Sequence, residues 1–378
     1  MKTLYDIFKT SRKLKKGLGE YGIEIETETK AAGHYPSGFF GEAFLKETKH
    51  GQKAYWQPRS IPEWYATEDG SLRDFGREFV FKNPLDYGLA MAALESWGVA
   101  LREVKFTKDA PATSVHVHMN VSEFSPVQLA NLLVMLLFFE NLLTEFSGEI
   151  RRSNTFARPV RCADAAVDNF HSLIDSIDKG KKNAIHFEEQ HTKYGAINLA
   201  TIYEYGSVEI RCFRGTTDHV QIQDWLTILN RIYKFAKDPG LTPMAFYETY
   251  KEIETEIVDR VFGSDAGKLK CKNWKNWLKR NEFYLADFST ILTDWNSLGS
   301  RYDIRDEPIK KTKGEFGGMT ADEINALQDM QTIQFSPASI QPWASAPLIN
   351  PAPIPVVNDD DDPLEIYMPD DDEDDGQF

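Results

Sequence analysis

Cysteine is scarce in this sequence. Its 378 residues include three cysteines, Cys162, Cys212 and Cys271. Because their number is odd and their spacings are long, the sequence indicates neither a disulfide framework nor a zinc site of the CxxC type. We therefore expect a reducing compartment and a cytoplasmic location.

Long hydrophobic runs are also missing. The longest apolar run, Leu132 to Phe139, is far shorter than the roughly 20 residues that a membrane-spanning helix needs. It predicts a buried helix. The basic residues near the N-terminus are not followed by an apolar stretch of signal-peptide length. We therefore expect no membrane partner.

Positive charge is absent from residues 316–378, which hold 14 of the 58 acidic residues. The rest of the chain carries 44 acidic residues against 43 lysines and arginines, although the net charge of the whole is -15. This near balance argues against a nucleic-acid partner. The acidic, proline-rich end has too few apolar side chains to offset the entropy of ordering it. We predict a linker and a disordered tail over 310–378, and a basic protein partner for the tail stays open.

Three strand-like stretches each carry one aliphatic face and one face of functional groups. They cover 22–28, 115–121 and 208–213. Side chains of an extended chain alternate between two sides with period two. The functional groups of each stretch therefore share a side: Glu24, Glu26 and Glu28; His116, His118 and Asn120; Glu209 and Arg211.

Carboxylates, imidazoles and an arginine on one side of a sheet are suited to metal ions and phosphates. A partly buried row of carboxylates is unfavourable without a cation, and hard cations such as Mg²⁺ or Mn²⁺ take oxygen ligands. Each stretch alone also has an ordinary structural explanation. The solvated face of an antiparallel sheet, hydrogen-bonded imidazoles and a cross-strand ion pair produce the same patterns.

The remaining chain alternates strand-like and helical patterns. Short strands are predicted at 64–67 and 77–81, and 194–202 pairs with 207–214 as a hairpin with Gly206 in its turn. Residues 29–61 are a loop-rich insert that could form a flap over the site.

Helix signals are clearest where a cap precedes an apolar pattern. Ser125 to Gln128 forms a capping box with proline at the first helical position, which opens a long apolar helix to about Phe146. Asp218 is expected to cap a helix that ends near Lys237. Further helices are predicted at 84–99, 168–178, 245–261, 274–279 and 283–295.

These patterns divide the chain into four parts. A basic lead-in covers 1–20, and the functional strands and their helices cover 21–240. A helical C-terminal extension packed on that domain covers 241–309, and the tail covers 310–378.

The order of the short motifs is more specific than any one of them. It resembles the amidoligase family, a branch of the glutamine-synthetase-like carboxylate–amine ligases, over about Tyr21 to Lys237. The motifs are GIEIETE from 22, WxxxxDGS from 64, REFVFKNPL from 77, SxHVHMN from 114, RRSNTFARP from 151, KYGAINL from 193 and SVEIRCFRGT from 207.

The resemblance implies an α+β fold: a curved antiparallel sheet with helices on its outer face, as in the glutamine-synthetase-like catalytic fold. It implies ATP and Mg²⁺ (or Mn²⁺) as cofactors and ATP-dependent amide formation through an acyl phosphate. The partners would be a small-molecule or peptide carboxylate and an amine. A homo-oligomer stays open.

The resemblance also implies roles for single residues. Arg211 would neutralise the transferring phosphoryl group, Asp69 would attract and deprotonate the incoming ammonium, and Glu78 would join them in catalysis. Nucleotide or substrate would contact Arg211, Arg158, Asn198, Asn120 and His118. Metal ions would be held by Glu24, Glu26, Glu78, His116 and Glu209.

Two other functions fit parts of the pattern. A metal-dependent hydrolase would use the same carboxylates and histidines to activate water. A non-enzymatic assembly or scaffold protein would act through the acidic tail. The Glu209-x-Arg211 pair and the Asp-Gly-Ser turn fit a phosphorylated carboxylate and an amine better than they fit hydrolysis.

Overall fold

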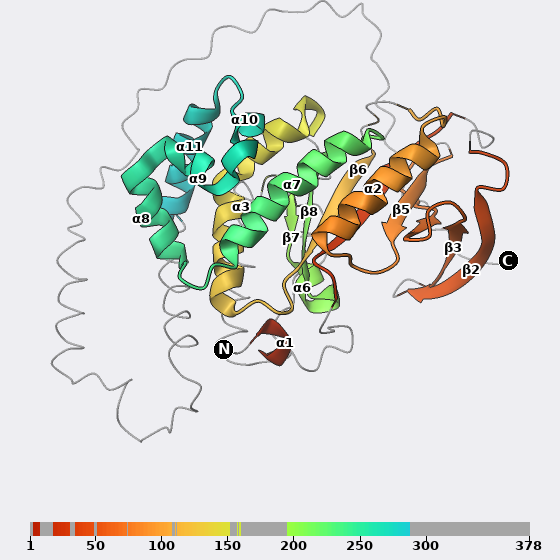
Figure 1. Ribbon diagram of the computed structural model, residues 1–378, viewed down its shortest axis with the longest axis horizontal. Helices are drawn as coiled ribbons and strands as arrows, with labels where there is room; N and C mark the ends of the chain where they lie inside the picture. The colour runs from red at the N-terminus through yellow and green to blue at the C-terminus, as the bar shows by residue number, and fades with distance from the viewer. Residues whose placement is uncertain are drawn as a thin grey trace, which may run out of the picture. The chain divides into compact units, whose positions relative to one another are not determined.

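One eight-stranded antiparallel sheet organises the fold (Figure 1). Its strand order is β2-β3-β4-β5-β1-β6-β8-β7. The strands are β1 (Tyr21–Thr27), β2 (Phe40–Thr48), β3 (Gly51–Pro58), β4 (Trp64–Thr67), β5 (Arg77–Phe81), β6 (Ser114–Asn120), β7 (Ile197–Asn198) and β8 (Ser207–Arg214). The mixed α and β architecture with an antiparallel sheet is therefore confirmed.

The computed structural model describes residues 3–7, 18–30, 35–48, 51–73, 75–107, 110, 112–151, 157, 159 and 195–287. The predictions for Arg158, for a helix over 168–178 and for the tail beyond 310 lie outside these residues. All of the described residues belong to one compact unit within 1–308. The division of this unit near residue 240 stays a prediction.

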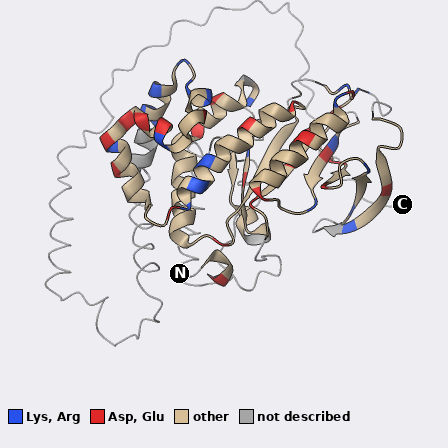
Figure 2. Cartoon of the chain, viewed as in Figure 1, with Lys and Arg blue, Asp and Glu red and all other residues tan. Residues whose placement is uncertain are grey.

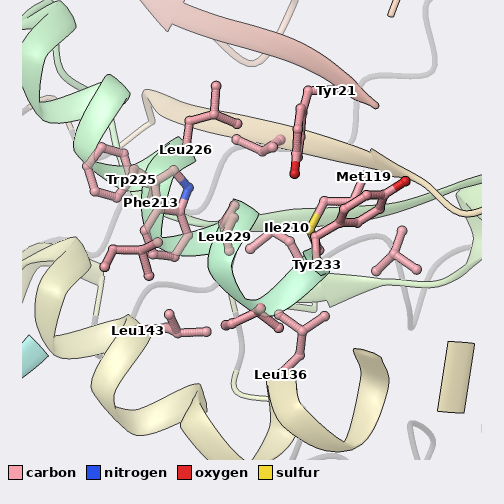
Figure 3. Packing of buried hydrophobic residues seen from close by; sticks show 14 of the residues in the cluster. Tyr21, Met119, Leu136, Leu143, Ile210, Phe213, Trp225, Leu226, Leu229 and Tyr233 are labelled. Atoms are coloured by element: carbon pink, nitrogen blue, oxygen red, sulfur yellow. The ribbon is translucent and has the colours of Figure 1, made fainter. Parts of the chain in front are cut away.

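Three long helices cover the aliphatic face of the sheet: α2 (Tyr87–Leu101), α3 (Pro126–Ser147) and α7 (His219–Ala236). Figure 3 shows Tyr21, Met119 and Ile210 of the sheet meeting side chains of α7 and α3. The ring of Phe213 stacks on Trp225 of α7 at 4.9 Å between centroids. The Tyr21 hydroxyl donates to Asn230 Oδ1 at 2.9 Å, which satisfies a buried polar group of this core.

The caps of α3 and α7 are those that the sequence predicts. Ser125 and Gln128 complete a reciprocal capping box with Pro126 in the first turn of α3. The Asp218 side chain accepts from Val220 N at the start of α7. A stretch of α3 has the length and hydropathy of a membrane span, and 94% of it is buried inside the structure. That burial explains why the helix is apolar on all sides.

Smaller helices complete the described chain: α1 (Leu4–Ile7), α6 (Ala200–Tyr205), α8 (Pro243–Ile253), α9 (Ile257–Phe262), α10 (Ala266–Leu269) and α11 (Trp274–Asp287). The predicted helix over 245–261 is interrupted between α8 and α9 at Glu254, which has a positive φ of 46°. In Figure 2, residues of both charge signs are interspersed along this helical layer, and α7 carries both.

Two predicted segments differ from the structure. The insert is not a loop-rich flap: its central part is the β2–β3 hairpin, which extends the sheet beyond β4. The predicted hairpin of 194–202 with 207–214 is wrong in its first arm, because only Ile197–Asn198 is strand and α6 follows at once. Gly206 ends α6 in the left-handed conformation, at φ 73°.

Candidate functional site

The register of four strands brings the predicted polar residues to one face of the sheet. Glu24 of β1 is paired with His116 of β6 and, on its other side, with Val80 of β5. Glu209 of β8 is paired with His118 of β6. Directly paired residues project to the same side of a sheet. Side chains from distant parts of the sequence therefore meet on the face opposite the helices, which we call the polar face.

Glu24 lies at the centre of this group. Its Oε2 is 3.2 Å from His116 Nδ1, and its Oε1 is 3.3 Å from His118 Nε2. Single ligand atoms of Glu24, His118 and Glu209 lie within 4.8 Å of one another. Two carboxylates and one imidazole at this spacing can hold one divalent cation, and we call these three residues the acid–histidine cluster.

The two histidines differ in which nitrogen is available. His116 Nε2 lies 2.6 Å from Ser114 Oγ, and the Ser114 hydroxyl is also 2.6 Å from Glu26 Oε2. Both ring nitrogens of His116 thus face protein partners. His118 Nε2 is buried and lies 3.3 Å from Glu24 Oε1, but it makes no well-aligned hydrogen bond to any residue that the structure describes. His118, predicted as a nucleotide contact, is therefore better placed than His116 to bind a metal.

Glu209 is held by two neighbours on the polar face. Its Oε1 accepts from Arg211 Nη1 at 2.6 Å, and its Oε2 accepts from Asn198 Nδ2 at 2.7 Å. With both oxygens fixed, the carboxylate has a set orientation toward the histidines. Arg211 and Asn198 thus lie beside the acid–histidine cluster, as the sequence predicts.

A β-bulge lies directly after Ile210 on β8, at Arg211 and Cys212. Between the pairs Val117↔Ile210 and Val115↔Phe213, β8 has one more residue than β6. Alternation already turns Arg211 to the polar face, and the extra residue lets Cys212 and Phe213 both reach the core. Arg151, which is buried, supports the bulge by donating from Nη2 to the Arg211 carbonyl at 2.7 Å.

Glu78 and Glu26 are paired on β5 and β1, so a second pair of carboxylates borders the cluster. Lys53 of β3 lies 3.0 Å from Glu78 Oε2. Burial and the nearby charge of Glu24 raise the pKa of Glu78 to about 8, although Lys53 opposes this shift. An acid that resists ionisation beside another acid is where an added cation would be most stabilising.

The charges of the cluster itself are mutually compensated. Burial acts to raise the pKa of Glu24, but the close contacts with His116 and His118 hold it well below its usual range. Burial likewise acts to raise the pKa of Glu209, and the charge of Arg211 lowers it overall. Burial acts to lower the pKa of His118, and the contact with Glu24 raises it.

Asp69 and Asn120 lie at the margins of the polar face. Ser71 N donates to Asp69 Oδ1 at 2.7 Å, which forms the predicted turn. Burial acts to raise the pKa of Asp69, but Ser71 and the charge of Lys53 lower it overall. Asn120 donates to Gly19 O at 3.0 Å and accepts from Ser122, so its amide is largely used within the fold.

Two cavities adjoin the two ends of the acid–histidine cluster. One, of about 170 Å³, borders Glu24 and His118 and has a mostly apolar lining that includes Val80, Pro84 and Tyr205. Gly22 lies on its floor, where an added Cβ would be 3.3 Å from His118 Cβ. The other cavity, of about 320 Å³, begins at Glu26 and is mostly polar.

Sequence reasoning missed Ser114, Lys53 and Arg151. Ser114 is the residue before the His-x-His stretch, and its parity with His116 could have placed it on the same face. Lys53 lies in the insert, whose strands were not predicted. Arg151 begins the RRSNTFARP motif, but its role in supporting the bulge has no local sequence signal.

Comparison with known proteins gives one family. Residues 82–233 match the model of a family described as "Putative amidoligase enzyme". The resemblance found in the motif order is confirmed over this segment, and the match indicates a ligase-type enzyme. No curated protein matches the chain. The segment includes His116, His118, Glu209 and Arg211, whereas Glu24 and Glu78 precede it.

Proposed function

Because residues 82–233 match the amidoligase family, we propose that this chain is an ATP-dependent carboxylate–amine ligase that works with Mg²⁺ or Mn²⁺. The proposal includes a curved sheet of the glutamine-synthetase-like kind, with the polar face as its working side. One observation carries it. Glu24, His118, Glu209 and Arg211 converge on one face of the sheet, with a metal-binding group next to a phosphate-binding one.

The donor set fits a hard divalent cation. The acid–histidine cluster offers two carboxylates and one imidazole nitrogen within 4.8 Å. His118 Nε2 is buried 3.3 Å from Glu24 Oε1 and has no well-aligned hydrogen bond among the described residues, so its lone pair can serve a metal shared with that carboxylate. Glu78 and Glu26 supply further oxygen donors beside the cluster, and Mg²⁺ prefers oxygen. In this proposal Glu24, Glu209 and His118 hold the metal.

In the proposed reaction a substrate carboxylate takes the γ-phosphoryl group of ATP, ADP leaves, and an amine then displaces phosphate from the acyl carbon to form the amide. Magnesium–ATP supplies the leaving group, because a carboxylate cannot otherwise expel oxide. The residues of the chain contribute position and charge, which are the main sources of catalysis in phosphoryl transfer.

Each residue near the cluster has a task in this scheme. Arg211, held by Glu209, would stabilise negative charge on the transferring phosphoryl group. Asp69, whose pKa is lowered overall by Ser71 and Lys53 against the effect of burial, would attract the ammonium and accept its proton. The mostly apolar cavity beside Glu24 and His118 has a lining suited to the nucleotide base.

A trapping experiment tests the reaction class without knowledge of the amine. Purified protein, ATP, Mg²⁺ and a panel of carboxylates are incubated with hydroxylamine, which captures an activated acyl group as a hydroxamate. We expect hydroxamate and ADP in equal amounts for at least one carboxylate. Arg211→Ala and Glu24→Gln should each lower the rate by at least about 100-fold, because each removes a charge from the phosphoryl site.

The matched control is Glu95→Gln, which replaces an exposed carboxylate on α2 by a carboxamide. It should leave the rate unchanged, and all three variants should keep the circular dichroism spectrum of the wild type. Phosphate release from ATP without hydroxamate for every carboxylate, or full activity in both site variants, would contradict the proposal.

A further inference from the structure

The polar cavity at the Glu26 end of the acid–histidine cluster has a composition that the proposed function has not used. It lies where β1 and β8 end and β6 begins, and its volume is about 320 Å³. Its lining includes the carboxylates of Glu26, Glu28 and Asp218, the guanidinium of Arg214, and the hydroxyl side chains of Thr107 and Thr113. Glu26 borders the acid–histidine cluster and also lines this cavity, so a molecule in the cavity would lie beside the metal-binding residues.

Arg214 brings a positive charge to the cavity. Its Nη1 donates to the Ser147 carbonyl at 3.2 Å, and its Nη2 donates to the Gln221 side-chain oxygen. Both acceptors are neutral. Within the described part of the chain, no carboxylate lies within 4.0 Å of this guanidinium, so several of its N–H donors can bind an anion.

The side chain of Arg214 is held in place. Gln221 Nε2 donates to Asp218 Oδ2 at 2.8 Å, which fixes the amide whose oxygen receives the guanidinium. Gly215 packs closely against the adjoining wall of the cavity, because an added Cβ there would lie 1.9 Å from Thr113 Oγ1. An arginine oriented in this way loses little entropy when it binds a carboxylate.

Glu28 brings the opposite charge. It is 4% exposed, and its Oε1 accepts from Arg73 N at 2.8 Å. No lysine, arginine or histidine side chain of the described residues lies within 4.0 Å of it. Thr107 Oγ1, also in the lining, is buried and has no hydrogen-bond partner among those residues. Among the described residues, the cavity thus holds a carboxylate without a charged partner, a guanidinium without a carboxylate partner and a hydroxyl without a hydrogen bond.

We propose that this cavity binds a free amino acid as a zwitterion, with its carboxylate on Arg214 and its ammonium on Glu28. The inference rests on the proposed ligase function, for which it names the class of one substrate. A single molecule with both groups would pair the buried Glu28 and the half-buried Arg214 at once, which neither a simple acid nor a simple amine can do.

Other ligands fit less well. A nucleotide phosphate would meet the carboxylates of Glu26 and Glu28, and an uncharged sugar would leave Arg214 and Glu28 unpaired. The volume is near the lower end of the roughly 300–1,000 Å³ found for small-molecule sites. It suits a compound of amino-acid size better than a folded partner.

Binding is measured by titration calorimetry on the full chain with Mg²⁺ and a non-hydrolysable ATP analogue. The probes are the twenty L-amino acids. For each one that binds, its N-acetyl form and its α-carboxamide follow. We expect at least one free amino acid to bind, and both derivatives to bind at least tenfold more weakly, because each has lost one of the two charged groups.

Two variants assign the groups to their partners. Arg214→Met should weaken binding of the free amino acid at least tenfold. It should leave the weaker binding of the α-carboxamide unchanged, because that form has no α-carboxylate for Arg214 to pair with. Glu28→Gln should weaken binding of the free amino acid by the same factor but leave binding of the N-acetyl form unchanged. Arg102→Met and Glu95→Gln, which alter exposed side chains, should bind all probes as the wild type does.

The inference is overturned if no free amino acid binds, or if both site variants bind it normally. It is also overturned if the losses do not follow the removed group. The two proposals fail separately. Nucleotide binding with no amino acid binding removes this inference and leaves the ligase function. Amino acid binding that follows the groups, in a protein that binds no ATP analogue, removes the ligase function instead.

Discussion

At the scale of single residues, the polar face places acids so close together that their protonation depends on their neighbours. The pKa of Glu24 is held well below its usual range by contacts with His116 and His118, although burial opposes this. Glu78, only one strand away, stays protonated well above the usual range because of burial and of the charge of Glu24. A bound cation would favour the ionised form of both carboxylates, so the stability of the metal-free protein should depend strongly on pH.

We expect the metal-free protein to lose stability as pH rises from about 5 to 8. The pKa of Glu78 is near 4.5 when unfolded and is raised to about 8 when folded. Between these values the folded state keeps a proton that the unfolded state has lost, so the free energy of unfolding falls with pH. The raised pKa of His118 acts in the same direction. Urea denaturation in EDTA should show a decrease on the order of a few kcal/mol.

Glu78→Gln provides the control for this pH dependence. The variant cannot ionise at this position, so its free energy of unfolding should fall less between pH 5 and pH 8 than that of the wild type. Equal slopes for the two proteins would show that Glu78 is not the residue responsible.

Ser114→Ala should destabilise the protein by about 1–3 kcal/mol, because Glu26 Oε2 and His116 Nε2 would both lose a buried hydrogen-bond partner. Thermal unfolding measures the loss. Ser96→Ala, on the exposed side of α2, makes the same chemical change without a buried partner and should have almost no effect. Equal stability in the two variants would contradict the proposed network.

At the scale of elements, the sequence was sufficient where short-range signals agree with tertiary packing. The capping box at Ser125 and the cap at Asp218 predicted α3 and α7 correctly, because a cap depends on residues only three apart. Gly206 misled the prediction, since a glycine with positive φ ends a helix as well as it turns a hairpin. The β2–β3 strands were missed because their exposed surroundings leave no clear apolar alternation.

Gly206→Ala should destabilise the protein by about 1–2 kcal/mol, since a side chain is strained at φ 73°. Chemical denaturation measures the loss. Gly88→Ala is the matched control, because Gly88 lies in α2 with open space around it. Alanine should stabilise that helix by about 0.5–1 kcal/mol. The two variants should therefore shift in opposite directions, and a shift in the same direction would contradict the assignment of α6.

At the scale of the whole molecule, the two faces of one sheet have different roles. Its aliphatic face packs against α2, α3 and α7, and the opposite face carries the candidate site. Period-two alternation predicted which residues share a face, and so much of the site. Alternation could not predict the strand order, the bulge at Arg211 or the position of His118 Nε2 beside Glu24. These depend on contacts between residues about 90 positions apart.

The chain cut after residue 308 should fold and keep its activity. The buried core found in the described residues runs from Leu4 to Leu278, all within the compact unit of 1–308. We expect its melting temperature to lie within about 2 °C of the full chain, since surface changes away from a core alter stability by less than about 0.5 kcal/mol. Hydroxamate formation should also be unchanged. Loss of either would show that residues 309–378 contribute to the catalytic unit.

The strand order has a consequence for how the protein comes into being. Glu24 meets His116 across 92 positions of sequence, and His118 is joined to Ser207 across 89. Long loops must close before such contacts form, which slows folding. A chain emerging from the ribosome therefore has no complete cation site until β8 has been translated, and an mRNA truncated before that codon would encode a product without the cluster.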